Sequence, residues 1–314
     1  MMVKGYYELP ENSADVVFVG SSGVYRFWQP AFGFKEEGIA STAFATSTLP
    51  GFCVREVTEE VLKTQSPKVL VVSPTMFLKV DDLLENRIYF LSMNMRPSKT
   101  RFHMLGSFCD YLGTPYADRL RFYLPFLQFH SVWNEFFEGS FRRTIEPLLN
   151  SCYQGRFLEG QATGISHSAT PDWELPVDER LERALRDYLD YCRGLDTEVI
   201  FYEPPIWESE GRAANSAYIK KIIQEYGFEV IDFGSEENYR LLKLDEDSDI
   251  MDGTHTNVRG SYKFSKVFAK MLKDRYDLPD RREDPTYQDW VVKAEQYYEI
   301  TEPYMQEEQK EDGE

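Results

Sequence analysis

Short apolar runs alternate with longer amphipathic segments along much of the chain. The apolar runs are rich in β-branched and aromatic residues and are bounded by Gly, Pro and small polar residues, which is typical of buried strands. Five such runs predict strands over these ranges: Asp15–Val19, Ile39–Phe44, Lys68–Ser73, Glu198–Tyr202 and Phe228–Asp232.

Amphipathic segments separate several of these strands. In the segment Val177–Cys192, leucines recur at helical spacing and charges occupy the other face. Strands joined by helical crossovers pair in parallel, with right-handed connections. The pattern predicts a three-layer α/β/α fold with a doubly wound, five-stranded parallel sheet, flavodoxin-like in its layers. Further helices are predicted over these ranges: Phe52–Thr64, Ala213–Tyr226 and Val258–Lys273.

Two regions depart from the alternation. No strong strand pattern occurs between about residues 80 and 165, where aromatic, helix-like segments predict a helical insertion over the sheet. The segment Tyr25–Phe34 is interrupted by Pro30 and is predicted as a loop with a short helix. We therefore expect one domain over residues 1–280. Residues 281–314 are predicted to form an acidic tail, partly helical or disordered.

Two small motifs at opposite ends of the chain carry the candidate chemistry. Ser21 and Ser22 follow the first strand in a turn bounded by Gly20 and Gly23, and Asp252 precedes His255 by three residues. Ligands of open α/β sheets bind beyond the carboxyl ends of the strands. A serine becomes a nucleophile when a histidine takes its proton and a carboxylate orients that histidine. The spacing predicts a Ser–His–Asp triad.

These motifs resemble those of the SGNH/GDSL hydrolase superfamily, which has its serine after the first strand and a final Asp-x-x-His block. The chain is most similar to a bacterial branch related to the D-alanine transfer protein of teichoic acids and to alginate O-acetylation proteins. The segments that carry this resemblance are Pro10–Pro30, Pro67–Ser73, Leu124–Trp133 and Asp252–Gly260.

The resemblance implies Ser22 as nucleophile, His255 as general base and Asp252 as its orienting acid. The Ser22 backbone N–H would be one oxyanion donor. The usual third block, Gly-x-Asn-Asp, is replaced by Val72-Ser73-Pro74-Thr75, which has no Asn. The candidate donors in its place are Ser21, Thr46, Ser47 and Thr75.

Other residues are weaker candidates for the same site. The resemblance suggests that His130 and Trp133 flank it, although a hydrogen-bonded core histidine beside a packing tryptophan is the favoured explanation. Tyr25 and Arg26 follow the nucleophile turn and are candidates for contacting an anionic or sugar substrate. Glu203 follows the fourth predicted strand at the same sheet edge and is a candidate for facing the site.

Composition excludes several classes of function. The net charge of −18 argues against nucleic acid and anionic lipid surfaces as partners. The four cysteines lack metal spacing, and no phosphate-loop or dinucleotide motif occurs, so no metal or cofactor is expected. No apolar run reaches membrane-spanning length and no signal peptide is visible, so the default expectation is a cytoplasmic chain. The family branch usually works outside the membrane, behind an anchor.

Three hypotheses therefore remain. The first is a serine esterase or O-acyltransferase acting on an acyl ester of a carbohydrate or cell-envelope polymer, with a membrane-bound acyltransferase as a partner implied by the family branch. The second is a non-catalytic SGNH-like binding or scaffolding protein. The third is a phosphate binder that uses the Gly20–Gly23 turn as an anion nest.

Overall fold

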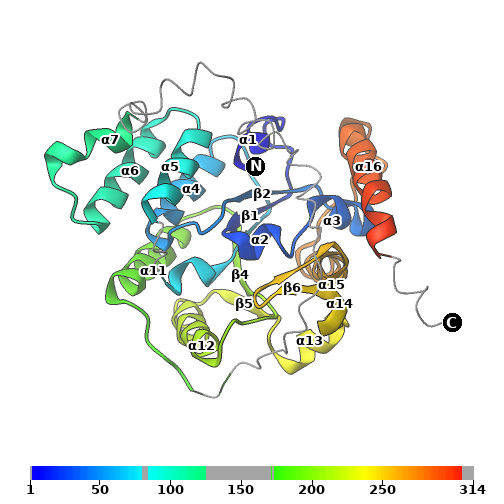
Figure 1. The fold of residues 1–314 in the computed structure, drawn as a ribbon. Helices are drawn as coiled ribbons and strands as arrows, with labels where there is room; N and C mark the ends of the chain where they lie inside the picture. The colour runs from blue at the N-terminus through cyan, green and yellow to red at the C-terminus, as the bar shows by residue number, and fades with distance from the viewer. Residues whose placement is uncertain (1, 80–83, 125–170, 172, 306–314) are drawn as a thin grey trace, which may run out of the picture.

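A computed structural model describes residues 2–79, 84–124, 171 and 173–305 of the chain (Figure 1). Its centre is a five-stranded parallel sheet in the order β2-β1-β3-β4-β5. The predicted α/β class and five-stranded parallel sheet are thereby confirmed. The strands are β1 (Val16–Gly20), β2 (Ser41–Ala45), β3 (Val69–Val72), β4 (Glu198–Glu203) and β5 (Glu229–Asp232).

Both faces of the sheet are covered, which explains why its central strands read as continuous apolar runs rather than alternating ones. Along β1, Val17 and Val19 point to one hydrophobic cluster, whereas Val16 and Phe18 point to the other. The first cluster includes apolar residues of α4 (Val54–Val61), α11 (Glu179–Cys192) and α12 (Glu210–Glu225). The second cluster includes those of α2 (Ser22–Tyr25) and α15 (Val258–Tyr276).

The region between β3 and α11 is helical where the structure describes it. It contains α5 (Leu84–Asn94), α6 (Lys99–Tyr111), the 3₁₀ helix η3 (Tyr116–Asp118) and α7 (Leu120–Tyr123). Helix α6 packs on α4, at one side of the molecule in Figure 1. Residues 125–170 lie outside the described part, so the rest of the predicted insertion stays a prediction.

A helix begins at Pro30, where the sequence pattern suggested an interruption. Helix α3 (Pro30–Glu37) has this proline in its first turn, where the missing N–H would have no intrahelical partner. Gly38 ends the helix with a left-handed conformation, φ 68°. The segment Tyr25–Phe34, predicted as a loop with a short helix, thus contains a non-helical stretch at residues 26–29 and the first turns of α3.

The acidic tail contains a packed helix. Helix α16 (Gln288–Met305) lies beyond residue 280 and packs against α3. Its Trp290 stacks on Phe34, and its buried Tyr297 contacts Phe32. The tail is thus helical over Gln288–Met305, and aromatic contacts join this helix to the core.

Smaller elements connect these parts. They are α1 (Met2–Tyr6), η1 (Gly51–Cys53), η2 (Pro74–Phe77), α13 (Glu236–Leu242), α14 (Glu246–Asp249), the antiparallel pair β6 (Ile250–Asp252) and β7 (His255–Thr256), and η6 (Pro285–Tyr287).

A buried carboxylate holds the β6–β7 hairpin against α15. Asp249 is fully buried and forms ion pairs with Arg259 at 2.6 Å and Lys263 at 2.5 Å. The Asp249 carbonyl also accepts from the Asn257 N–H, and a Cβ on Gly260 would lie 2.6 Å from that carbonyl oxygen. The chain therefore needs glycine at residue 260 to bring helix and hairpin this close.

Asp249→Ala is expected to lower the free energy of unfolding by about 3–5 kcal/mol, because it leaves two cationic groups without their buried partner. Urea denaturation measures this change. Glu236→Ala is the matched control: it breaks an exposed ion pair with Arg240 and should cost less than about 1 kcal/mol. Equal losses in the two variants would contradict a structural role for the buried network.

Candidate active site

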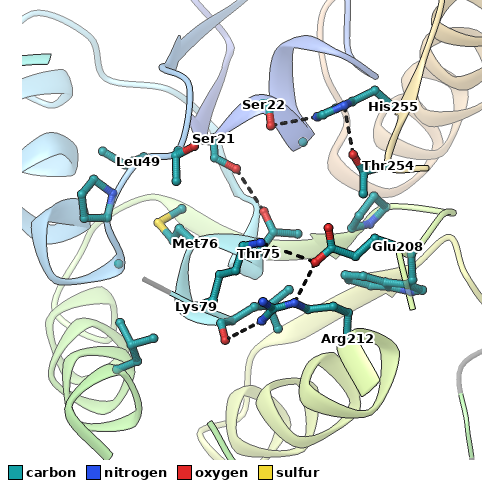
Figure 2. A pocket seen from close by; sticks show the side chains of 18 of the residues that line it. Ser21, Ser22, Leu49, Thr75, Met76, Lys79, Glu208, Arg212, Thr254 and His255 are labelled. Carbon is teal, nitrogen blue, oxygen red and sulfur yellow. Dashed lines mark hydrogen bonds and ion pairs between the residues drawn. The ribbon is translucent and has the colours of Figure 1, made fainter. Parts of the chain in front are cut away.

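A cleft with a volume of about 170 Å³ opens at the carboxyl edge of the sheet (Figure 2). Its walls come from the segments that follow β1, β2, β3 and β4, and from the β6–β7 hairpin. Parallel strands deliver all these loops to one edge, which is where open α/β sheets bind their ligands. Ser22 and His255 both line the cleft.

The turn after β1 is tightly held. Gly20 ends the strand, and a Cβ there would lie 2.7 Å from Val24 Cγ2 and 3.0 Å from Ser73 Cβ. The buried Tyr202 hydroxyl on β4 donates to the Gly23 carbonyl at 2.6 Å. These contacts require glycine at the end of β1 and fix the start of α2, where Ser22 lies.

The hairpin presents Asp252 and His255 as paired residues on adjacent strands. Between them, the Thr254 N–H donates to Asp252 Oδ1 at 2.9 Å, and the Thr254 hydroxyl donates to the same oxygen at 3.0 Å. The Thr256 hydroxyl donates to the Arg26 carbonyl at 2.6 Å, which joins the hairpin to the end of α2. The hairpin and the nucleophile turn are therefore connected directly.

Ser22, His255 and Asp252 form a continuous hydrogen-bonded chain. His255 Nε2 lies 2.9 Å from Ser22 Oγ, and His255 Nδ1 lies 2.8 and 2.9 Å from the two Asp252 carboxylate oxygens. An Nδ1–H that donates to the carboxylate leaves the Nε2 lone pair to accept the serine proton. The structure thus brings together the three residues predicted for the triad. Ser22 and His255 are 233 residues apart along the chain.

The electrostatics of the site favour a neutral histidine beside an ionised aspartate. Burial lowers the pKa of His255, and the nearby Arg26 lowers it further, although Asp252 opposes both effects. Burial would raise the pKa of Asp252, but hydrogen bonds from His255 and Thr254 outweigh it and hold that pKa below its ordinary value. His255 is therefore available as a base at neutral pH.

A second set of hydroxyl groups lines the cleft beside Ser22. Ser21 Oγ lies 3.2 Å from Thr75 Oγ1, which lies 3.0 Å from Ser73 Oγ. Ser21 and Thr75 both border the cleft, and Figure 2 shows their hydroxyls turned toward each other. Two of the four predicted oxyanion candidates are thus placed at the site.

The other two candidates on the β2 loop do not line the cleft. Thr46 is buried, and its Oγ1 has no hydrogen-bond partner among the described residues. Ser47 is half-buried, and Thr48 lines the cleft instead, with a positive φ of 54°. The left-handed turn at Thr48 is the local reason that this residue and Leu49 reach the cleft.

The aromatic and charged residues after the nucleophile turn are also outside the cleft lining. Tyr25 is buried in the cluster between the sheet and α15. Arg26 donates to the Met251 sulfur at 3.3 Å, and its charge lowers the pKa of His255. Neither residue is placed to contact a ligand in the cleft. His130 and Trp133 lie outside the described residues, so their predicted role stays a prediction.

Glu203 ends β4 but points away from the cleft lining. It is fully buried, and the Ser216 hydroxyl donates to its Oε1 at 2.5 Å, while its Oε2 has no partner among the described residues. Burial, and then the nearby Asp232, raise the pKa of Glu203 to about 8. Strand alternation places it on the same face of β4 as Val199 and Phe201, toward α12.

Sequence reasoning missed a charged group on the cleft wall. Glu208 accepts from Arg212 at 2.9 Å and lies 3.5 Å from Lys79 Nζ, and Arg212 also donates to the Leu78 carbonyl (Figure 2). The Glu208–Arg212 pair has the i,i+4 spacing of a helical ion pair. That spacing, just after a strand that ends at the cleft edge, was the available signal.

The described residues contain neither a metal-binding group nor a membrane-spanning helix. No group of three or more His, Cys, Asp or Glu side chains is arranged to hold a metal ion there. Within the same residues, no helix combines the length and the apolar character that crossing a membrane requires.

The pKa of His255 can be measured by NMR titration of its ring protons, identified by their loss in His255→Gln. We expect a midpoint below 6.5, because burial disfavours the imidazolium. In Asp252→Asn the midpoint should fall further, since the carboxylate is the group that raises it. A midpoint at or above 6.5 in the unmodified protein, or an upward shift in the variant, would contradict this account.

Comparison of the sequence with models of protein families finds no match, and comparison with curated proteins finds none either. The geometry of the cleft and the motifs that line it are therefore the basis for assigning a function to this protein.

Proposed function

We propose that this protein is an SGNH/GDSL-type serine esterase or O-acyltransferase that acts on an acyl ester of a carbohydrate or cell-envelope polymer. One observation carries the proposal: Ser22 Oγ lies 2.9 Å from His255 Nε2 in a ligand-accessible cleft, while Asp252 accepts from the other ring nitrogen. A serine, a base and an orienting carboxylate in this order are the requirements for an activated nucleophile.

In the proposed mechanism, Ser22 Oγ attacks the ester carbonyl carbon and its proton passes to His255 Nε2. The bond between that carbon and the alcohol oxygen then breaks, and the imidazolium returns the proton to the leaving alcohol. Asp252 stabilises the imidazolium between these steps. Water or a sugar hydroxyl then attacks the acyl-enzyme, with His255 as base again, which releases an acid or a transferred ester.

The oxyanion is assigned to the Ser22 backbone N–H and to the hydroxyl of Thr75. Thr75 follows β3, and a Cβ built on Gly23 would lie 3.4 Å from its Oγ1, so this hydroxyl approaches the nucleophile turn closely. Ser21 and Ser73 hold the hydroxyl in place through the contacts described above. A fixed donor of this kind stabilises developing charge without reorganisation.

A non-catalytic, SGNH-like binding or scaffolding role is the second candidate. It is favoured by one feature of the cleft: among the described residues that line it, no Asn or Gln side chain offers an amide donor. The two candidates differ in whether Ser22 reacts. A membrane-bound acyltransferase as the supplier of acyl groups belongs to the first candidate and rests on the family resemblance.

Fluorophosphonate labelling is expected to modify Ser22 and only this residue of the turn. Ser22→Ala should lose the label, whereas Ser21→Ala should keep it, because only Ser22 contacts His255. Peptide mass spectrometry identifies the labelled residue. Label that persists in Ser22→Ala would exclude the triad assignment.

Asp252→Asn should lower the rate of ester hydrolysis by about 10⁴-fold, because it favours the wrong tautomer of His255.

The role of Thr75 is tested by two near-isosteric variants. Thr75→Val removes the hydroxyl and should lower kcat for ester hydrolysis by about 10²–10³-fold with little change in KM. Thr75→Ser keeps the hydroxyl and should retain most of the activity. If the two variants lose activity equally, packing rather than hydrogen bonding explains the effect of Thr75.

A further inference from the structure

The cleft beside Ser22 has two chemically different halves. In Figure 2, Leu49 and Glu208 lie on opposite sides of the cleft. The charged half contains Lys79, Glu208 and Arg212, and the apolar residues Ile206 and Trp207, which precede Glu208 in the chain, line the cleft as well. The apolar half consists of Leu49, Pro50, Phe52, Met76, Leu84 and Leu181.

The apolar half is built from well-packed core residues rather than mobile surface groups. Leu49 is 2 % exposed and Leu181 is 1 % exposed, yet both border the open space. A Cβ on Gly51 would lie 2.5 Å from Phe77 Cδ1, so η1 and η2 are in close contact behind this wall. A preformed apolar wall of this kind favours an apolar ligand, because the ligand covers the wall and so removes apolar surface from water.

The charged half satisfies its own charges. Arg212 donates to Glu208 and to the Leu78 carbonyl, and Lys79 is the second cation near Glu208. Glu208 and Lys79 are both about half exposed, so they can hydrogen-bond to a polar group without leaving water. This half therefore suits hydroxyl groups and disfavours an alkyl chain, which would separate the charges from solvent.

Resting on the proposed esterase or acyltransferase function, we propose that the cleft binds an apolar acyl chain longer than acetyl in its apolar half. The alcohol part of the ester then lies toward Glu208 and Arg212. An acetyl group ends at the carbonyl carbon plus one methyl, so it leaves most of the apolar wall in contact with water. Each added methylene instead covers part of that wall.

The specificity is tested with p-nitrophenyl acetate, butanoate and hexanoate. We expect kcat/KM to rise by up to about fourfold for each methylene added between acetate and hexanoate. Leu84→Trp and, independently, Leu49→Phe fill the apolar half and should abolish this preference, so that kcat/KM for hexanoate no longer exceeds kcat/KM for acetate in the same variant. Leu241→Trp, at a half-exposed position of α13 outside the cleft, is the matched control and should keep the preference. Melting temperatures identify any variant that fails to fold.

A binding measurement separates this inference from the catalytic proposal. Hexanoate should raise the melting temperature of both the unmodified protein and Ser22→Ala, acetate at equal concentration should not, and Leu84→Trp should lose the hexanoate effect. Hexanoate stabilisation without any ester turnover would overturn the catalytic proposal and support the apolar site. Ester turnover that is fastest with acetate, together with no hexanoate stabilisation, would overturn the apolar site alone.

Discussion

The buried carboxylate of Asp249 is the constraint on which the geometry of the site depends. It neutralises Arg259 and Lys263 on α15, and its backbone carbonyl accepts from Asn257 at the start of that helix. The hairpin that presents the base follows directly after this carboxylate. A charge this far from water is tolerated only with close partners, so the partners hold the hairpin in one place.

The second constraint is the depth at which the sheet is buried. Because helices cover both faces, every residue of β1 and β3 is buried. The turn after β1 therefore packs closely against Val24 and Ser73. Gly20 fits there because it has no side chain, and the Tyr202 hydroxyl on β4 donates to the carbonyl of Gly23 in α2. Ser22, the proposed nucleophile, is thus positioned by the core of the protein rather than by a surface loop.

The sheet could be predicted because continuous apolar runs between amphipathic segments have few alternative structures. The helix at Pro30 was predicted only as a short helix within a loop, because a proline that interrupts a pattern and a proline that begins a helix look alike until the packing of α3 is known. The tail was predicted to be partly helical, but the packing of α16 could not be predicted, because its Trp290 contacts Phe34, more than 250 residues earlier in the chain.

At the site, the triad was predictable because Ser22, Asp252 and His255 carry recognisable spacing around glycines. The oxyanion candidates were less predictable, because neighbouring small polar residues on one loop look equivalent in the sequence: Thr48 lines the cleft, whereas Thr46 and Ser47 do not. The ion pair between Lys79 and Glu208 joins two loops that are far apart in the sequence, so no local sequence pattern predicts it.

The burial of Glu203 couples folding of the protein to the uptake of a proton. A carboxyl group with a pKa of about 8 stays protonated at neutral pH in the folded protein, whereas the same group ionises in the unfolded chain. Folding therefore takes up a proton at the end of β4. This contribution to stability is fully present below the unfolded pKa and is lost progressively as the pH rises from there through about 8, so it is absent in alkali at the end of the strand that also carries Tyr202.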